Sequence, residues 1–425
     1  MQQSNCAIIG GGIIGITAAL ELQNRGLQVT LFDRNAIGLG ASFGNAGFLA
    51  CESINPLPTM SNVKNSFSLL FQRHGALALP LANWRNTAKW LALFLQQANS
   101  RNVAKNQKSL HFLLNEATED WKKLLKRYDL SHHLIKTFYM RTWESADGIA
   151  TAQAEQAFYQ QWNIEAKWAN RECVRELQPY LADTVHHAVL LPYAHRVQDP
   201  YALCLALFDA FLKRGGQFVQ TNIQYLKPVA DGMVLFGEGQ KWHFQRAMLC
   251  AGAHSHELLK DWGLNLPLIA ERGYHLTLPD QQYLLNGPIC SAERNIFVNP
   301  LECGLRVTGF SELANTKMPA YLKRYQSLKH HIEQLLPAIR PALNQAKQWV
   351  GMRPTLPDSL PIIDVHPHYP QLGMAFGHQH LGLTLAARSA KLSCDLLLNQ
   401  STELELKAFR ADRFAWSGQW KEPSI

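Results

Sequence analysis

Three glycines near the N-terminus have the spacing of a phosphate-binding turn. Gly10-x-Gly12-x-x-Gly15 follows a short apolar run, Cys6–Ile9, and opens a helical pattern over Ile13–Gln23. In such a unit the first glycine allows a tight turn, the second lets a pyrophosphate approach the backbone, and the third lets helix and strand pack closely. The spacing predicts a dinucleotide at the helix N-terminus, and a glycine turn without a ligand is the alternative interpretation.

Two features downstream narrow the choice of dinucleotide. Asp33 closes the next predicted strand, Gln28–Phe32, where its carboxylate could accept hydrogen bonds from both ribose hydroxyls of an adenosine. A second loop of small residues, Gly38–Gly47, follows directly, and its backbone amides could pack against a second phosphate and the edge of a flavin. Because a simple NAD domain has no need of this loop, the sequence predicts FAD. A flexible surface loop is the alternative.

The histidines do not have the pattern of a metal site. His-His pairs occur at 132–133, 186–187 and 330–331, and His366-x-His368 lies near Asp364. None has a third ligand at the helical or strand spacing expected for zinc. The sequence also lacks Gly-x-Ser-x-Gly, a Walker loop and His-Glu-x-x-His. We therefore predict no metal site.

The elements that must position these residues follow an interleaved pattern. A chain of 425 residues is longer than the roughly 250–300 residues of a single core, so two domains are expected. Strand patterns occur around 136–143, 187–193 and 285–310, and a helix is predicted from Asp199–Pro200 to Lys213. The other helical patterns cover 69–125, 320–340 and 377–398, and Ala247–Cys250 is typical of a buried strand. This order predicts a nucleotide-binding fold assembled from separated segments, with another domain built from the insertions.

Composition predicts an intracellular protein with packed cores. Hydrophobic residues make up 47% of the chain, which is ample for two cores. Apolar runs long enough for a spanning helix do not occur, and no basic stretch precedes the first apolar residues, so we expect neither a membrane span nor a signal peptide. The eight cysteines are scattered without Cys-x-x-Cys, which favours free thiols in a reducing cytosol.

The formal net charge of +8 is compatible with several partners. A basic balance can reflect nucleic acid, an anionic membrane surface or an anionic substrate. Runs of five or more Lys/Arg do not occur, so the charge is spread along the chain. A generally basic soluble enzyme is the plainer interpretation, and we predict no nucleic-acid partner.

Further motifs keep their order across nearly the whole chain. They are Ser42-Phe43-Gly44-Asn45-Ala46-Gly47, Asp199–Pro200 with its helix, Leu249–Ser255, Arg272–His275, Gly351–Asp358 and Gly377–Thr384. With these motifs the chain resembles the D-amino acid oxidase superfamily of flavoproteins, and most of all its bacterial D-amino acid dehydrogenase branch. Residues 52–135 and 145–190 carry little of the resemblance.

The resemblance implies an α/β fold. An FAD-binding Rossmann-like domain of the glutathione-reductase type would be interleaved with an α+β substrate domain that contains a large mixed or antiparallel sheet. Residues 1–55, 195–262 and 345–425 would form the FAD-binding domain, and residues 56–194 and 263–344 the substrate-binding domain.

The resemblance also implies three catalytic positions. Arg353, in Gly-x-Arg-Pro, resembles the arginine that binds the substrate carboxylate, and its planar, permanently charged fork suits that partner better than a lysine would. A structural salt bridge is the alternative. Tyr274 resembles a substrate-pocket tyrosine, with a core tyrosine as the alternative. His378 belongs to the turn beside the flavin.

The predicted cofactor-binding residues come from the glycine loop, the second loop and the later motifs. Gly377 and Leu381–Thr384 resemble the turn and helix start whose amides stabilise the flavin edge that becomes anionic on reduction. Ile223 resembles an adenine contact. The full set is Gly10, Gly12, Ile13, Ile14, Gly15, Asp33, Arg34, Ser42, Asn45, Ala46, Gly47, Ile223, Ala251, Gly252, Gly377, Leu381, Gly382, Leu383 and Thr384.

Two positions depart from the family pattern. Leu383 stands where many dehydrogenase relatives have a tryptophan, and Arg388 partly replaces small residues. These departures put the identity of the substrate in doubt more than that of the cofactor.

The implied activity is FAD-dependent oxidation of an amino acid, most of all a D-amino acid. A carboxylate held by Arg353 would present the α-hydrogen to flavin N5, and water would hydrolyse the imino acid to a 2-oxo acid and ammonia. Alignment dominates such chemistry, so no general base is assigned. Oxidation of glycine, sarcosine or another secondary amine of the D-proline type shares every motif. A flavin-dependent RNA-modification protein and a redox-silent flavin scaffold are alternatives of other classes.

The electron acceptor is predicted as either oxygen or a quinone. Residues 66–98 combine aromatic residues and leucines with Arg73, Arg85 and Lys89, on helices flanking Pro80. This composition fits a segment in a membrane interface, which a quinone-linked dehydrogenase would need. The alternative is that the apolar face packs into the substrate domain. The expected location is the cytoplasm, with peripheral contact at the inner face of the cell membrane.

Overall fold

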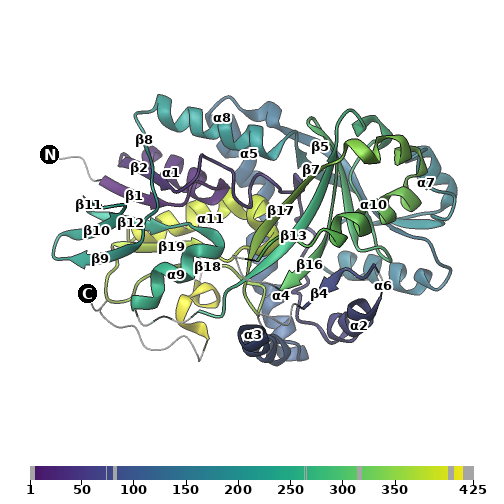
Figure 1. Ribbon diagram of the computed structural model, residues 1–425, viewed down its shortest axis with the longest axis horizontal. Helices are drawn as coiled ribbons and strands as arrows, with labels where there is room; N and C mark the ends of the chain where they lie inside the picture. The colour runs from purple at the N-terminus through teal and green to yellow at the C-terminus, as the bar shows by residue number, and fades with distance from the viewer. Residues whose placement is uncertain are drawn as a thin grey trace.

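The computed structural model describes residues 5–72, 74–79, 84–262, 264, 266–313, 318–400 and 406–414. Two large sheets organise this part of the chain, one toward each side of Figure 1, and helices flank both. The chain passes repeatedly from one sheet to the other, so each domain is assembled from separated segments. The predicted fold class, a Rossmann-like domain interleaved with an α+β domain, is confirmed.

The first sheet has the order β18-β19-β12-β1-β2-β8. Its strands are β1 (Asn5–Ile9), β2 (Gln28–Asp33), β8 (Gln217–Gln220), β12 (Arg246–Leu249), β18 (Ile362–Val365) and β19 (Leu372–Phe376). All neighbours pair in parallel except β18 and β19, which are antiparallel. Central parallel strands are buried on both faces, which explains their continuous apolar runs. A small antiparallel sheet joins β9 (Tyr225–Val229), β10 (Gly232–Gly237) and β11 (Gln240–Phe244).

Helices α1 (Ile13–Asn24), α5 (Ala117–Arg127), α8 (Pro200–Lys213) and α11 (Gly382–Leu397) share one hydrophobic cluster with this sheet. The start of α8 agrees with its sequence signal. One carboxylate oxygen of Asp199 accepts the N–H groups of Tyr201 and Ala202, each at 2.8 Å, and Pro200 opens the helix.

The second sheet has the order β17-β13-β16-β15-β14-β5-β7-β3. Its strands are β3 (Phe48–Leu49), β5 (Leu134–Trp143), β7 (His187–Val197), β13 (Ile269–Leu278), β14 (Ile289–Ser291), β15 (Ile296–Leu301), β16 (Gly304–Leu313) and β17 (Lys347–Thr355), with β4 (Leu77–Ala78) on β16 and β6 (Lys167–Ala169) on β7. Most neighbours are antiparallel, whereas β14–β5 and β16–β4 are parallel. Helices α6 (Gly148–Gln161), α7 (Arg171–Leu177) and α10 (Lys323–Leu335) lie on this side of Figure 1.

The domain boundaries differ from the predicted ones at three places. β17 and β3 belong to the second sheet, although both were predicted in the FAD-binding segments. Helices α4 (Ser100–Asn115) and α5 pack against α11, although residues 56–194 were predicted in the substrate domain. Each strand or helix packs on the core that covers its apolar face, so a nearby sequence motif does not determine the domain to which the element belongs.

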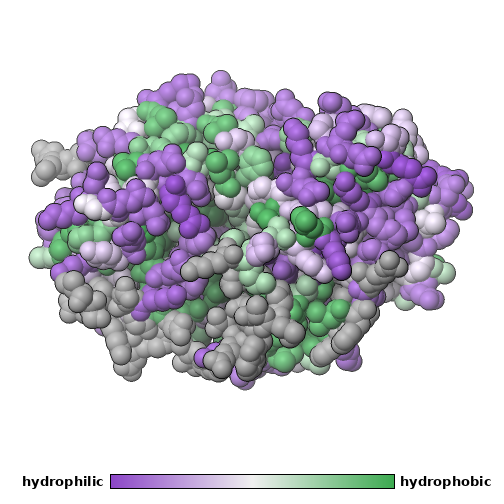
Figure 2. Space-filling view, in the orientation of Figure 1, coloured by the Kyte–Doolittle hydropathy of each residue, from purple (hydrophilic) through white to green (hydrophobic). Residues whose placement is uncertain are grey.

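The segment predicted to contact a membrane overlaps two helices, α2 (Met60–Phe71) and α3 (Trp84–Gln97). Part of that prediction falls outside the described residues, namely Arg73, Pro80 and the side chains of Phe67, Leu69, Phe71, Trp84 and Arg85. On α3, Trp90 and Leu93 are buried, and Trp90 packs with Ile269 and Leu313. These side chains therefore follow the alternative interpretation, packing into the protein. Hydrophilic residues cover most of the described surface in Figure 2. No helix among the described residues is long and apolar enough to cross a membrane.

A buried ion pair joins α5 to α11 and accounts for the departure at position 388. Arg388 Nη1 lies 3.2 Å from Asp120 Oδ2, with side chains only 6% and 9% exposed, and the guanidinium also lies over the Phe112 ring. At a position near which the family often has small residues, this chain therefore has an arginine whose charge is balanced by Asp120.

We expect Arg388→Met to destabilise the protein by about 3–5 kcal/mol, because Asp120 would remain buried without a counter-ion. The urea unfolding midpoint, followed by tryptophan fluorescence, measures the effect. The double variant Arg388→Met/Asp120→Leu should recover much of the loss. A single variant as stable as the unchanged protein would show that the pair carries no stability.

Candidate active site

One large cavity, about 2180 Å³, is lined by residues of both domains. Its lining begins at the β1–α1 turn, passes along the second loop and the start of α11, and ends against the second sheet and α6. Most of the predicted site residues line it. The exceptions are Gly15, Gly47, Tyr274, Leu381 and Thr384.

The glycine turn is closed by tight backbone contacts. Gly10 has φ +116°, and a Cβ there would lie 2.3 Å from the carbonyl oxygen of Cys250. A Cβ on Gly15 would lie 1.8 Å from the Gly10 carbonyl oxygen, so Gly15 serves the packing of α1 on β1 beneath the cavity. Helix α1 begins at Ile13 without an acidic residue in its first turn. The positive end of the helix therefore faces the cavity, as a pyrophosphate site requires.

Asp33 lies at the end of β2 and organises the turn. Its Oδ2 accepts the Gly11 N–H at 2.7 Å and its Oδ1 accepts the Asn35 N–H at 2.8 Å. A carboxylate has about four acceptor positions, so two remain for ribose hydroxyls. Arg34, Ile223, Ala251 and Gly252 line the same end of the cavity.

The second loop is anchored by the substrate-domain sheet. Ser42 Oγ accepts the Ile13 N–H at 2.9 Å. Arg306 Nη1 donates to the carbonyls of Phe43 (3.2 Å) and Asn45 (2.7 Å), and Asn299 Nδ2 donates to that of Ala46 at 2.7 Å. The loop is therefore held in place from both domains and is not a free surface loop. The glycine turn, the helix end, Asp33 and this loop together fit FAD.

Arg353 projects from β17 into the cavity beside Glu271 on β13. Its Nη1 lies 3.0 Å from Glu271 Oε1 and donates to the Phe310 carbonyl at 3.1 Å. Ser311 and Thr355 donate their hydroxyls to the same carboxylate at 2.5 and 2.7 Å. Burial alone would raise the pKa of Glu271, but Arg353 and the two hydroxyls outweigh it and lower that pKa. Arg353 thus has a structural salt bridge and also faces the cavity.

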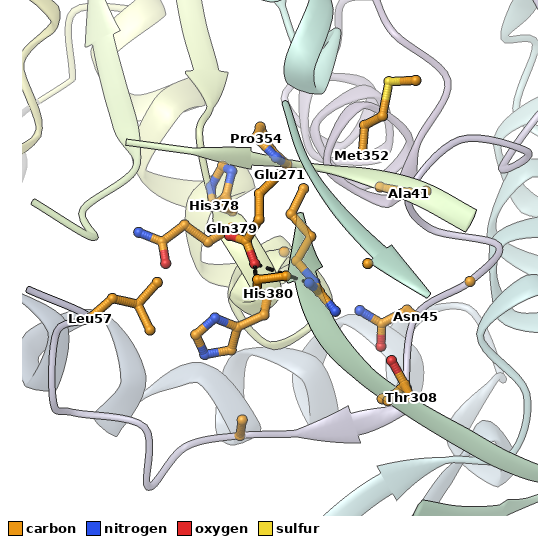
Figure 3. A pocket seen from close by; sticks show the side chains of 18 of the residues that line it. Ala41, Asn45, Leu57, Glu271, Thr308, Met352, Pro354, His378, Gln379 and His380 are labelled. Atoms are coloured by element: carbon orange, nitrogen blue, oxygen red, sulfur yellow. Dashed lines mark hydrogen bonds and ion pairs between the residues drawn. The ribbon is translucent and has the colours of Figure 1, made fainter. Parts of the chain in front are cut away.

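Gly377, His378 and Gly382 line the cavity at the start of α11, and Leu383 follows them. Burial lowers the pKa of His378 to about 3, and its Nε2 lies 2.8 Å from Ser389 Oγ, so the ring is neutral. Gln379 adopts φ +51°, and the next residue, His380, faces the cavity. Figure 3 shows His378, Gln379 and His380 on one side, with Asn45 and Thr308 across from them.

His380 was not predicted as a site residue, and neither was Glu271. Burial and then Arg353 lower the pKa of His380 to about 4, against the opposing effect of Glu271. His380 is exposed and lines the cavity. The repeat of histidines in Gly-His-Gln-His could have indicated this position. The partner of Arg353 could not be read from the sequence, because Glu271 precedes its motif and meets Arg353 only through the pairing of β13 with β17.

Tyr274 corrects the sequence prediction. Its side chain is fully buried and does not line the cavity. The hydroxyl donates to Glu312 and accepts the Tyr321 N–H at 3.1 Å, and the ring packs against Tyr325. Successive side chains of a strand alternate between faces, so Glu271 and Gly273 face the cavity while Tyr274 faces the other core. The core tyrosine was the correct alternative.

Three further predicted residues do not line the cavity but contact the segments that do. Thr384 Oγ1 accepts the Ala50 N–H at 3.0 Å, which fixes the chain after β3 to α11. Leu381 is buried in a hydrophobic cluster, and its N–H donates to the His378 carbonyl. Gly47 packs against Leu301 and Pro200. Across the described residues no group of His, Cys, Asp and Glu is arranged to hold a metal ion.

Comparisons with known proteins agree with this geometry. A D-amino-acid oxidase of Bradyrhizobium diazoefficiens is 29% identical over 421 residues, covering 96% of this chain and 98% of that protein. Glycine oxidase from Geobacillus kaustophilus superposes with a TM-score of 0.76 at 20% identity, over 97% of this chain and 100% of the other. L-proline dehydrogenase from P. horikoshii gives 0.73 at 16% identity, over 97% of each chain. These two likenesses concern the fold.

The family model described as "FAD dependent oxidoreductase", DAO, matches residues 5–396. That span includes the glycine turn, Asp33, the anchored second loop, Arg353 and the start of α11. The chain therefore belongs to the DAO family of FAD-dependent oxidoreductases.

Proposed function

We propose that this enzyme oxidises the α-carbon of a D-amino acid, and that the imino acid formed is hydrolysed by water to a 2-oxo acid and ammonia. The observation that carries the proposal is the position of Arg353, a fixed guanidinium in the same cavity as the glycine turn. The curated relative named D-amino-acid oxidase supports the D configuration.

The Arg353–Glu271 pair suits a zwitterion. Arg353 would hold the α-carboxylate with the N–H groups that Glu271 and Phe310 do not occupy, and these two partners fix its orientation. Glu271 and the neutral His380 line the cavity beside this cation and could accept hydrogen bonds from the substrate amine. FAD, when bound, supplies flavin N5 as the hydride acceptor.

We expect D-amino acids to reduce the flavin under anaerobic conditions, seen as bleaching of its visible absorption, whereas their L enantiomers do not. The panel should include glycine, sarcosine and D-proline, because the sequence motifs fit their oxidation equally well and a glycine oxidase and an L-proline dehydrogenase share the fold. Bleaching by glycine or N-methyl amino acids alone would replace this proposal with secondary-amine or glycine oxidation. No bleaching by any amine would indicate a redox-silent scaffold.

Arg353→Lys should raise the apparent substrate constant by well over tenfold, because a charge-assisted carboxylate pair is worth about 1.5–3 kcal/mol. The flavin spectrum should be retained, since Arg353 is not among the cofactor contacts. Arg101→Lys, on the exposed face of α4, is the matched control. An unchanged constant would assign the carboxylate to another arginine. Arg306 is poorly placed to bind the carboxylate instead, because its Nη1 already donates hydrogen bonds to two carbonyls of the second loop.

We further propose oxygen, and not a membrane quinone, as the electron acceptor, since Trp90 and Leu93 of α3 pack inward. Turnover should be faster with oxygen than with a quinone analogue, and the protein should not sediment with anionic vesicles at low salt. Vesicle binding that high salt reverses, together with preference for the quinone, would instead indicate a peripheral membrane dehydrogenase.

A further inference from the structure

The described lining of the cavity has a charge balance opposite to that of the chain. Among the described residues, seven carboxyl side chains line it against three guanidinium groups, and no described lysine does. The acids are Asp33, Glu52, Asp147, Glu155, Glu257, Glu271 and Glu293, and the arginines are Arg34, Arg141 and Arg353. Asp33 belongs to the cofactor end, and Glu271 is neutralised by Arg353. The remaining excess of carboxylates lies mainly at the end formed by β5, α6 and the chain after β3.

At that end Arg141 and Glu155 form a pair. Arg141 Nε on β5 lies 3.3 Å from Glu155 Oε2 on α6, and the Tyr159 hydroxyl donates to Glu155 Oε1 at 2.8 Å. The Arg141 side chain is 36% exposed although the residue is deep in the protein, so its open surface faces the cavity. One guanidinium therefore neutralises one carboxylate of this end.

Glu52 has no cation of its own among the described residues. Its Oε1 accepts the Ser53 hydroxyl at 3.3 Å, and no ion pair joins it to a described Lys or Arg. Burial, with a smaller contribution from Glu155, raises the pKa of this carboxyl to about 7, although Arg141 opposes the shift. An ionised carboxyl in a buried cavity is costly unless a proton or a ligand cation neutralises it. A cationic ligand group would supply the missing charge, whereas a second carboxylate would be repelled.

Glu52 is also connected to the substrate site. Two residues before it, the Ala50 N–H is bonded to Thr384 at the start of α11. Five residues after it, Leu57 lies in the pocket of Figure 3 with His380 and Glu271. The segment that carries Glu52 therefore borders the amino-acid end of the cavity. Arg353 on β17 and Arg141 on β5 have four strands between them in the sheet, so a short side chain held at Arg353 would not approach the acidic end of the cavity.

We propose that this acidic end is a subsite for a distal cationic group, and that the preferred substrates are D-amino acids with a long side chain ending in a guanidinium or ammonium. Glu52 and Glu155 accept the hydrogen bonds of that group. The proposal rests on the proposed function, because it names the substrate class of the same reaction. The alternative is that the Arg141–Glu155 pair only links β5 to α6. That alternative would not explain why the Glu52 carboxyl faces the cavity without an ion pair to a described residue.

D-arginine and D-citrulline provide the test, because they are nearly isosteric and differ in charge. Anaerobic flavin reduction by the holoenzyme gives the rate constant and the substrate dissociation constant for each. The ratio of their specificities should favour D-arginine by about tenfold or more, the effect of one charge-assisted hydrogen bond. D-2,3-diaminopropionate, with its short cationic side chain, should lose most of this advantage.

Glu52→Gln and Glu155→Gln should each bring the D-arginine to D-citrulline ratio toward one. Glu176→Gln, an exposed acid on α7 outside the cavity, should leave it unchanged and controls for net charge. Glu52→Gln breaks no ion pair among the described residues. Flavin absorption that is retained in each variant shows that the variant still folds and binds FAD. Three results would overturn the subsite while leaving D-amino acid oxidation intact. They are equal specificities for D-arginine and D-citrulline, a D-arginine to D-citrulline ratio that neither variant changes, and a preference for D-glutamate. Failure of every D-amino acid to reduce the flavin would overturn both proposals.

Discussion

The contact of Arg306 with the second loop is the constraint on which the site depends. A guanidinium that is only 4% exposed must have its donors satisfied, and the Phe43 and Asn45 carbonyls do so. These carbonyls belong to the cofactor domain, whereas Arg306 stands on β16 of the other sheet. His275, on the neighbouring strand, lies 3.2 Å from the Gly44 carbonyl, and burial followed by Arg306 lowers its pKa to about 3. The cofactor loop is thus shaped by a neutral imidazole and a buried cation from the substrate domain.

This dependence explains why some features could be predicted from the sequence and others could not. The Gly10 turn, Asp33 and the Asp199 cap are local, because spacing along the chain determines their geometry. The position of Tyr274 depends on which face of β13 turns toward the cavity, and a motif of four residues does not specify that face. Alternation along the strand brings Glu271 into the cavity, although its residue type gave no sign of a role.

The acidic end of the cavity was the least accessible to sequence reasoning. Glu52, Arg141 and Glu155 are far apart in the chain and lie on a loop, a strand and a helix, within or beside regions that carried little family resemblance. A net charge of +8 is compatible with anionic partners, yet the described residues that line the cavity include more carboxyl than guanidinium groups. Net charge describes the field around the whole molecule, whereas a buried site is governed by the few charges that face it.

The two charged groups of the cavity differ in what they can recognise. Arg353 and Glu271 neutralise each other, and their orientation is fixed by Ser311 and Thr355 on adjacent strands. A neutral, rigid pair binds a zwitterion by matching its two charges, and this match is the same for every amino acid. Glu52 adds a carboxyl group that forms no ion pair with a described Lys or Arg. In the proposed subsite, selection among side chains comes from that end of the cavity and not from the part that binds the groups common to all amino acids.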